Sequence, residues 1–81
     1  MKKLIGKVKH FYPKISVAAV ELTGGLKVGD KICIEGHGNE VEQAVDSMQI
    51  ENKAIKVAKK GDVIGLKVSA DVKEQDLVYL A

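Results

Sequence analysis

The sequence predicts an all-β fold: a small closed or nearly closed β-barrel of six to seven strands, built from residues 1–81 as one domain. Apolar and polar residues alternate along several short runs, which is the period of strands that bury one face. Corners rich in Gly and Asp separate these runs, for example at residues 23–30 and 59–62. No stretch keeps a helical period, and closure would hide the edges that a small open sheet exposes.

The composition limits the chain to one modest core. A chain of 81 residues buries only about 60 to 65% of the surface that its unfolded form exposes. The hydrophobic fraction of 46% and the charged fraction of 30% are typical of a globular protein. No apolar run approaches the roughly 20 residues of a membrane span, and no apolar signal segment follows the first lysines. We therefore expect a cytoplasmic protein without a membrane partner.

The first two expected strands precede the main corner. Residues 4–11 alternate, and we place Val8 in the core, on the same side as Leu4 and Gly6. Residues 12–14 form a connector, because the proline at its centre cannot donate to a ladder. In the second strand, residues 15–22, the charged Glu21 faces outward and fixes the phase. The inward residues of that strand are then Ala18, Val20 and Leu22.

The corner at residues 23–30 contains two apolar residues, Leu26 and Val28, which we expect to fold back and plug the end of the barrel. A third strand follows at residues 31–35. Its alternation places Ile32 and Ile34 inward and Cys33 outward.

The second half of the chain continues the pattern. Residues 40–51 form a long extended run whose phase slips between Val45 and Met48, which suggests a β-bulge. A short segment at 54–58 and a clear strand at 63–68 follow, the latter with Ile64, Leu66 and Val68 inward. The closing run at 76–81 leaves two phases open, in which either Leu77 and Tyr79 or Val78 and Leu80 face the core.

Five segments together resemble a known barrel: residues 20–22, 25–32, 45–49, 58–66 and 75–79. They resemble the second domain of translational GTPases of the elongation factor Tu type, a β-barrel of the translation-protein type. They are also similar to the small barrel at the C-terminus of the collagenase-like peptidase family, some of whose members are linked to RNA modification. Because these residues form turns and core, the resemblance indicates a fold more than a function.

Several activities are not expected. The chain has no Gly-x-x-x-x-Gly-Lys-Ser/Thr loop, so it should not hydrolyse nucleotides. His10 and His37 lack partners at metal-ligand spacing, and Cys33 is the single cysteine, so we expect no metal site, no cofactor and no disulfide. The carboxylates fit solvent-facing strand positions rather than a catalytic pair, so the chain is not expected to be an enzyme.

The basic N-terminal strand carries the strongest functional signal. Residues 1–14 contain five lysines and no acid, and residues 7–14 place cations among three rings. Cations follow phosphates and rings stack on unpaired bases, so this segment suits single-stranded RNA. The lysine pair at 59–60 would extend the surface if folding brought it close. The RNA-binding candidates are Lys7, Lys9, His10, Phe11, Tyr12, Lys14, Lys59 and Lys60.

These observations lead to one hypothesis and its rivals. The first is a non-catalytic, stand-alone translation-factor-like barrel in protein biosynthesis that binds transfer RNA, ribosomal RNA or a ribonucleoprotein. Its structural alternative is that Phe11 and Tyr12 merely cover the barrel end while the lysines are solvated. A second hypothesis is a protein-interaction module that docks on a separate catalytic partner through an exposed apolar patch, for which the candidates are Val17, Ala19 and Cys33. A third is self-association through a strand edge.

Overall fold

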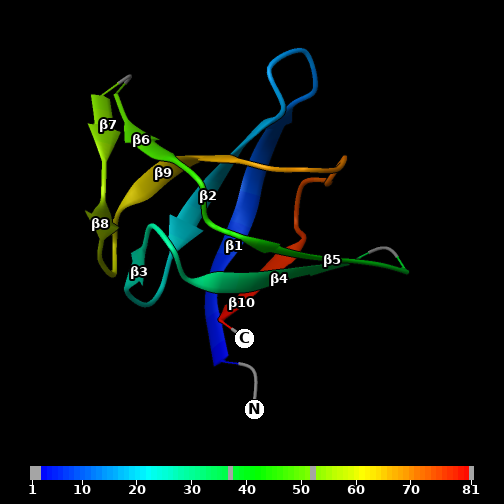
Figure 1. Ribbon diagram of the computed structural model, residues 1–81. Coiled ribbons are helices and arrows are strands. Elements are labelled where there is room, and N and C mark those ends of the chain that lie inside the picture. Colours follow the sequence, from blue (N-terminus) through cyan, green and yellow to red (C-terminus); the bar gives the residue numbers. More distant parts are fainter. Residues whose placement is uncertain (1–2, 37, 52, 81) are drawn as a thin grey trace.

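A computed structural model describes residues 3–36, 38–51 and 53–80 and shows ten strands in two antiparallel sheets (Figure 1). Eight strands form one sheet in the order β5-β4-β10-β1-β2-β9-β6-β7, and β3 pairs with β8 in a separate ribbon. Within these residues, no helix is long and apolar enough to span a bilayer. The strands are β1 (Lys3–Tyr12), β2 (Val17–Leu22), β3 (Leu26–Lys27), β4 (Lys31–Gly36), β5 (Asn39–Ala44), β6 (Met48–Ile50), β7 (Lys53–Ile55), β8 (Val57–Ala58), β9 (Val63–Lys67) and β10 (Leu77–Leu80).

The eight-stranded sheet is an open half-barrel. Its two end strands, β5 and β7, do not pair with each other, although the sheet curls around one apolar core. The all-β class is therefore confirmed, whereas the closed barrel of six to seven strands is wrong. The physical reason lies at residues 45–47, where the chain leaves the edge strand β5 and crosses to β6 near the opposite end of the sheet.

The crossing at residues 45–47 replaces the predicted β-bulge. The Val45 amide donates to the Asp30 carbonyl at 2.8 Å, and the Gly29 amide donates to the Val45 carbonyl at 3.0 Å. β5 pairs with β4, whereas β6 pairs with β9 and β7. The slip in apolar phase between Val45 and Met48 thus marks a change of strand partner, and both side chains are buried.

The side chain of Gln43 bridges the mouth of the half-barrel. Its Nε2 donates to the Lys67 carbonyl at 2.9 Å, and its Oε1 accepts from the Ser69 amide at 2.8 Å and the Ser69 hydroxyl at 3.1 Å. The side-chain amide of Gln43 therefore gives one donor and one acceptor to the neighbouring segment at residues 67–69, as the backbone of a paired strand does. This contact ties the edge strand β5 to the end of β9.

Two β-bulges curl β1 and change its phase. The register of β1 against β10 slips between Leu4 and Gly6, which makes Ile5 an extra residue and turns it into the core. Leu4 is exposed as a result, so its predicted inward position is wrong. A second slip, between Val8 and His10 against β2, leaves Val8 buried as predicted.

Most other core assignments are confirmed. The last strand buries Val78 completely and packs Leu80 partly against the core, which settles its phase. Cys33 alternates with the core residues Ile32 and Ile34, so it faces outward as predicted. It is nevertheless buried, because it lies between Tyr79 and Glu42 on the flanking strands. The confirmed core positions are Ala18, Val20, Leu22, Leu26, Ile32, Ile34, Ile64, Leu66 and Val68.

Three corners repeat one four-residue turn, Lys-x-x-Asp. In each, the Asp carboxylate accepts the Lys amide, at 3.1, 3.0 and 2.9 Å for residues 27–30, 59–62 and 73–76. The Asp amide in turn donates to the Lys carbonyl. The third residue has positive φ, as in type II turns: 99° at Gly29, 95° at Gly61 and 76° at Gln75. The first of these turns directs Val28 to solvent at 39% exposure, so only Leu26 plugs the core.

Replacing Leu26 by alanine should lower the free energy of unfolding by about 2 to 5 kcal/mol, because it would empty a filled core position. Val28→Ala provides the matched control in the same corner and should change stability by less than about 0.5 kcal/mol, as exposed substitutions do. Urea denaturation of both variants measures the difference. Equal losses would show that Leu26 does not plug the core.

The repeated turn also separates backbone strain from side-chain crowding. A Cβ added at Gly61 would meet no atom within 4 Å, so Gly61→Ala should cost only the strain of an alanine at positive φ, about 1 to 2 kcal/mol. Gln75→Ala should be nearly neutral, because Gln75 already holds a Cβ at positive φ. Thermal unfolding of the two variants tests this, and a neutral Gly61→Ala would contradict it.

Candidate functional site

The register of the strands gathers apolar residues on the outer side of the sheet. Ala18 and Val20 of β2 face the core, so Val17 and Ala19 face outward. Val17 lies opposite Tyr12 on β1, and Ala19 lies opposite Gly65 on β9. Directly paired residues share a face. We define the outer apolar face as Tyr12, Ile15, Val17, Ala19, Val63 and Gly65.

Three members of this face are unusually exposed for large apolar side chains. Ile15 is 58% exposed, Val63 52% and Tyr12 47%. Val17, Ala19 and Gly65 are half-buried between them. Small side chains at Ala19 and Gly65 lower the middle of the sheet surface, while larger ones stand at its border. The face is therefore a run of small and apolar side chains on paired strands. Charged side chains border it, with Glu21 opposite Val63 and Lys67 opposite Val17.

A groove of about 740 Å³ occupies one end of the outer apolar face. Gly65 gives it depth, since a Cβ there would come within 3.4 Å of Val17 Cγ1. Lys67 Nζ donates to the Ile15 carbonyl at 3.0 Å, which ties the turn at residues 13–16 to β9. The lining residues are Tyr12, Ile15, Val17, Ser47, Gln49, Glu51, Gly65 and Lys67.

The chemistry of this groove suits binding. Among the described residues that line it, Glu51 is the single carboxylate, and none is a histidine or a cysteine. The groove thus presents no pair of acid and base groups held together. Its apolar walls, with an amide, a hydroxyl, a carboxylate and an ammonium at the border, match the anatomy of a protein interface.

The predicted RNA-binding residues of β1 are largely engaged within the chain. Lys9 Nζ lies 3.8 Å from the Glu21 carboxylate, and His10 Nδ1 lies 2.9 Å from Glu74 Oε2. The His10 and Tyr12 rings meet edge to face with centroids 4.5 Å apart. Acids from distant parts of the sequence therefore flank a strand whose own segment has none.

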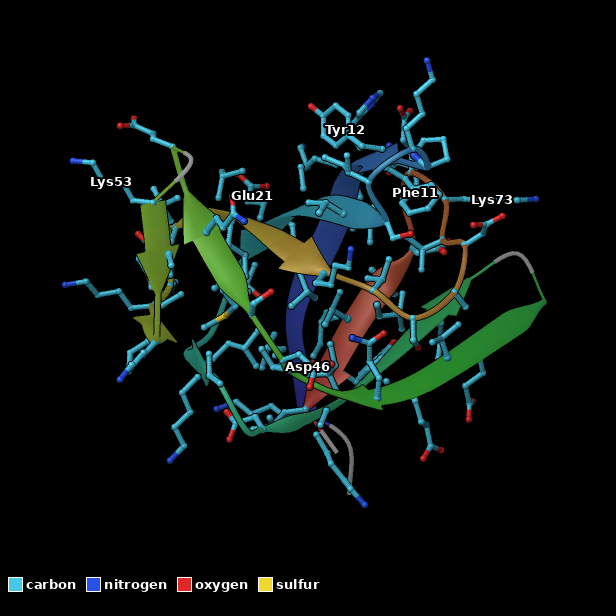
Figure 2. The ribbon with its side chains drawn as sticks, turned by 45° about the horizontal axis from the view of Figure 1, so that its top comes forward. Phe11, Tyr12, Glu21, Asp46, Lys53 and Lys73 are labelled. Carbon is cyan, nitrogen blue, oxygen red and sulfur yellow. The ribbon has the colours of Figure 1, made fainter. Side chains whose placement is uncertain are left out.

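The remaining candidates are scattered. Phe11 packs partly against the core, as its structural alternative proposed, and Lys7 is half-buried opposite Glu21 and Leu77. Lys14 is exposed in the turn after β1. Figure 2 shows Tyr12 and Phe11 at the same end of the molecule, where β1 finishes.

The Lys59 and Lys60 corner lies beside the end of β2. The Gly61 amide of this corner donates to the Leu22 carbonyl at 2.9 Å, which places the corner at the end of β2. Tyr12 pairs with Val17 at the start of β2, so the two groups lie at opposite ends of that strand. Lys7, by contrast, lies opposite Glu21 near the same end of β2 as the corner. The corner is therefore distant from Tyr12 and lies at the Lys7 end of the basic segment.

One cluster brings together atoms that can ligate a metal. Cys33, Glu35 and Glu40 each place one such atom within 4.8 Å of the others. Glu35 and Glu40 lie directly opposite each other on β4 and β5, and Cys33 Sγ donates to Glu35 Oε2 at 3.5 Å. Within the described part of the chain this gives three ligands, one fewer than a structural zinc site uses. His37 lies outside the described residues.

Sequence reasoning found part of the outer apolar face. It named Val17 and Ala19 and also named Cys33, which is buried. It missed Ile15 and Val63, although the sequence contained a signal for both. Val63 has the outward phase of a strand whose inward residues were correctly identified, and Ile15 lies in the turn before such a strand. It assigned Tyr12 to RNA stacking rather than to an apolar surface.

Comparisons with known proteins point to proteases. No family model matches the sequence. The chain is 49% identical over 77 residues to an uncharacterized protease of Methanocaldococcus jannaschii, covering 94% of the chain and 19% of that protein. The chain thus spans about a fifth of the length of this curated relative.

Solved structures agree on the fold. The C-terminal domain of a Geobacillus thermoleovorans "putative U32 peptidase" superposes with a TM-score of 0.88 at 16% identity, covering 94% of this chain and 96% of that one. A second crystal structure of that domain gives a TM-score of 0.87 at 16% identity, covering 94% and 89%. At this identity the likeness concerns the fold alone.

These matches correct the functional hypothesis. The resemblance to the barrel of collagenase-like peptidases is supported, whereas assignment to the second domain of translation factors is not. The predicted translation-factor-like role in protein biosynthesis with RNA binding is wrong, because the matched proteins are named as proteases. The chain has the fold of a C-terminal domain from a protein described as a peptidase, and its sequence matches part of a protease.

Proposed function

We propose that this chain is a non-catalytic accessory domain that docks on the catalytic part of a protease through the outer apolar face. The exposed apolar surface formed by Tyr12, Ile15 and Val63 is the observation that carries the proposal. The protease character of the partner is supported by the relative at 49% identity, of which this chain matches only a part.

The geometry of the face supports docking in two ways. Burying apolar surface yields about 25 cal/mol per Å², and this face already presents such surface without any rearrangement. Most of its residues lie on paired strands, so little conformational entropy is lost when a partner binds. Tyr12 adds a large side chain of the type that dominates binding energy in protein interfaces.

The same proposal explains why the groove holds no catalytic arrangement. An accessory domain contributes surface and rigidity, while the reacting groups belong to its partner. The lining of the groove, with its single carboxylate among the described residues, is consistent with that division. The proposal holds for a catalytic part on a separate polypeptide and for one on another segment of the same polypeptide.

The proposal is tested with the Methanocaldococcus jannaschii protease after deletion of the segment that matches this chain. The nuclease-treated remainder should form a complex with the purified chain in sedimentation velocity. Val63→Glu and Ile15→Glu should each weaken the complex at least about tenfold, because each places a charge in an apolar contact.

Leu4→Glu is the matched control. Leu4 is also an exposed apolar residue on a strand, but it lies at the start of β1, away from Tyr12. It should leave the affinity unchanged. Circular dichroism verifies that the three variants fold. Absence of a complex, or an equal loss for Leu4→Glu, would refute docking through this face.

A further inference from the structure

The β3–β8 ribbon forms a second exposed surface that the proposed docking does not use. Leu26 pairs with Ala58 and both are buried, whereas Lys27 pairs with Val57 and both face solvent. At 70%, Val57 has the highest exposure among the large apolar side chains in the described part of the chain. The ribbon therefore presents an aliphatic side chain at its outer surface.

Five exposed lysines lie on β3 or on residues 53–60, the segment that contains β8. The Val28 amide donates to the Lys56 carbonyl at 2.9 Å, which places Lys56 beside the first Lys-x-x-Asp corner. Figure 2 shows nitrogen-tipped side chains extending from β7 and β8 into solvent, with Lys53 labelled. No lysine of this set forms an ion pair within residues 3–36, 38–51 and 53–80. The set is Lys27, Lys53, Lys56, Lys59 and Lys60.

The nearby acids are occupied by the backbone. The Asp30 carboxylate accepts the Lys27 amide at 3.1 Å, and the Asp62 carboxylate accepts the Lys59 amide at 3.0 Å. Each aspartate thus holds its own corner together instead of reaching a lysine ammonium group. With respect to the described part of the chain, the five ammonium groups are therefore available to an outside partner.

A hollow of about 380 Å³ lies beside Val57. Its apolar lining includes Leu26, Ala58 and Leu80, and its charged lining is Lys27 and Asp30. The hollow thus has an apolar centre with Lys27 and Asp30 at its border, and Lys56 and Lys59 directly flank β8 in the sequence. An apolar centre with a charged rim is the arrangement found in protein interfaces. A single aliphatic side chain fits such a hollow while carboxylates next to it in the sequence reach the lysines.

We infer that the β3–β8 ribbon is a docking site for an acidic protein segment that carries an aliphatic side chain among its carboxylates. This site is independent of the outer apolar face and of the protease assignment. Charge complementarity selects the segment, and the hollow beside Val57 selects the aliphatic residue.

A protein segment suits the ribbon better than a nucleic acid does. Base stacking needs aromatic side chains, and no ring is present among the described residues that line the hollow. The chain also has no arginine, the residue best suited to bidentate contact with phosphate. Lysine ammonium groups pair with carboxylates, and Val57 contributes only aliphatic surface.

The probe for the test is a synthetic peptide, Gly-Glu-Asp-Leu-Glu-Asp-Gly, titrated into the isotopically labelled full chain and followed by amide NMR shifts. We expect the shifts to concentrate at residues 26–28 and 56–60. Replacing the leucine of the peptide by glycine should weaken binding about fivefold or more, and raising the salt concentration should weaken it further.

Variants of the chain complete the test. Lys56→Glu combined with Lys59→Glu should weaken binding at least about tenfold, whereas Lys14→Glu, an exposed charge reversal in the turn after β1, should not change it. A single-stranded oligonucleotide of equal charge should bind more weakly than the peptide. Shifts outside the ribbon, indifference to the leucine, or tighter binding of the oligonucleotide would each overturn the inference.

Discussion

The crossing of the chain from β5 to β6 holds the whole structure together. The sheet does not close by pairing its end strands, so residues 45–47 must carry the chain from one edge toward the other. The hydrogen bonds between Val45 and residues 29–30 fix this crossing to the main corner. Gln43 then joins the edge strand to the end of β9 through its side-chain amide. These contacts cover a core that an open sheet would otherwise leave exposed to solvent on one side.

Both candidate surfaces follow from this arrangement. The half-barrel turns one side of β2 and β9 toward the core, and the opposite side becomes the outer apolar face around Ala19 and Gly65. The short strand β3 of the main corner pairs with β8 in a ribbon separate from the large sheet. In the Lys-x-x-Asp turns at both ends of that ribbon, the aspartates accept backbone amides, and these lysines form no ion pair within the described residues. One fold therefore presents an apolar surface and a basic surface on different elements.

The segregation of basic and acidic residues along the sequence differs from their arrangement in the folded chain. Residues 1–14 contain no acid, yet β1 lies beside Glu21, and the loop between β9 and β10 brings Glu74 to His10. The lysines of the ribbon set come from two parts of the sequence that are far apart, residue 27 and residues 53–60. The basic surface therefore lies around the β3–β8 ribbon, where the sequence contained a weaker signal for it than residues 7–14 did. Antiparallel pairing between distant strands is the reason, because it determines which side chains become neighbours.

The sequence alone determined the strand class, the corners and nearly all inward positions, because period-two alternation and Gly-Asp turns depend only on local backbone geometry. It correctly indicated Val8, Leu26 and Ile64 as core residues. Tertiary structure alone decided the exchange of Leu4 for Ile5, the burial of Cys33 and the open edge at β5, since bulges and strand partners arise from contacts distant in sequence. The same distant contacts assembled the outer apolar face, whose members the sequence named only in part.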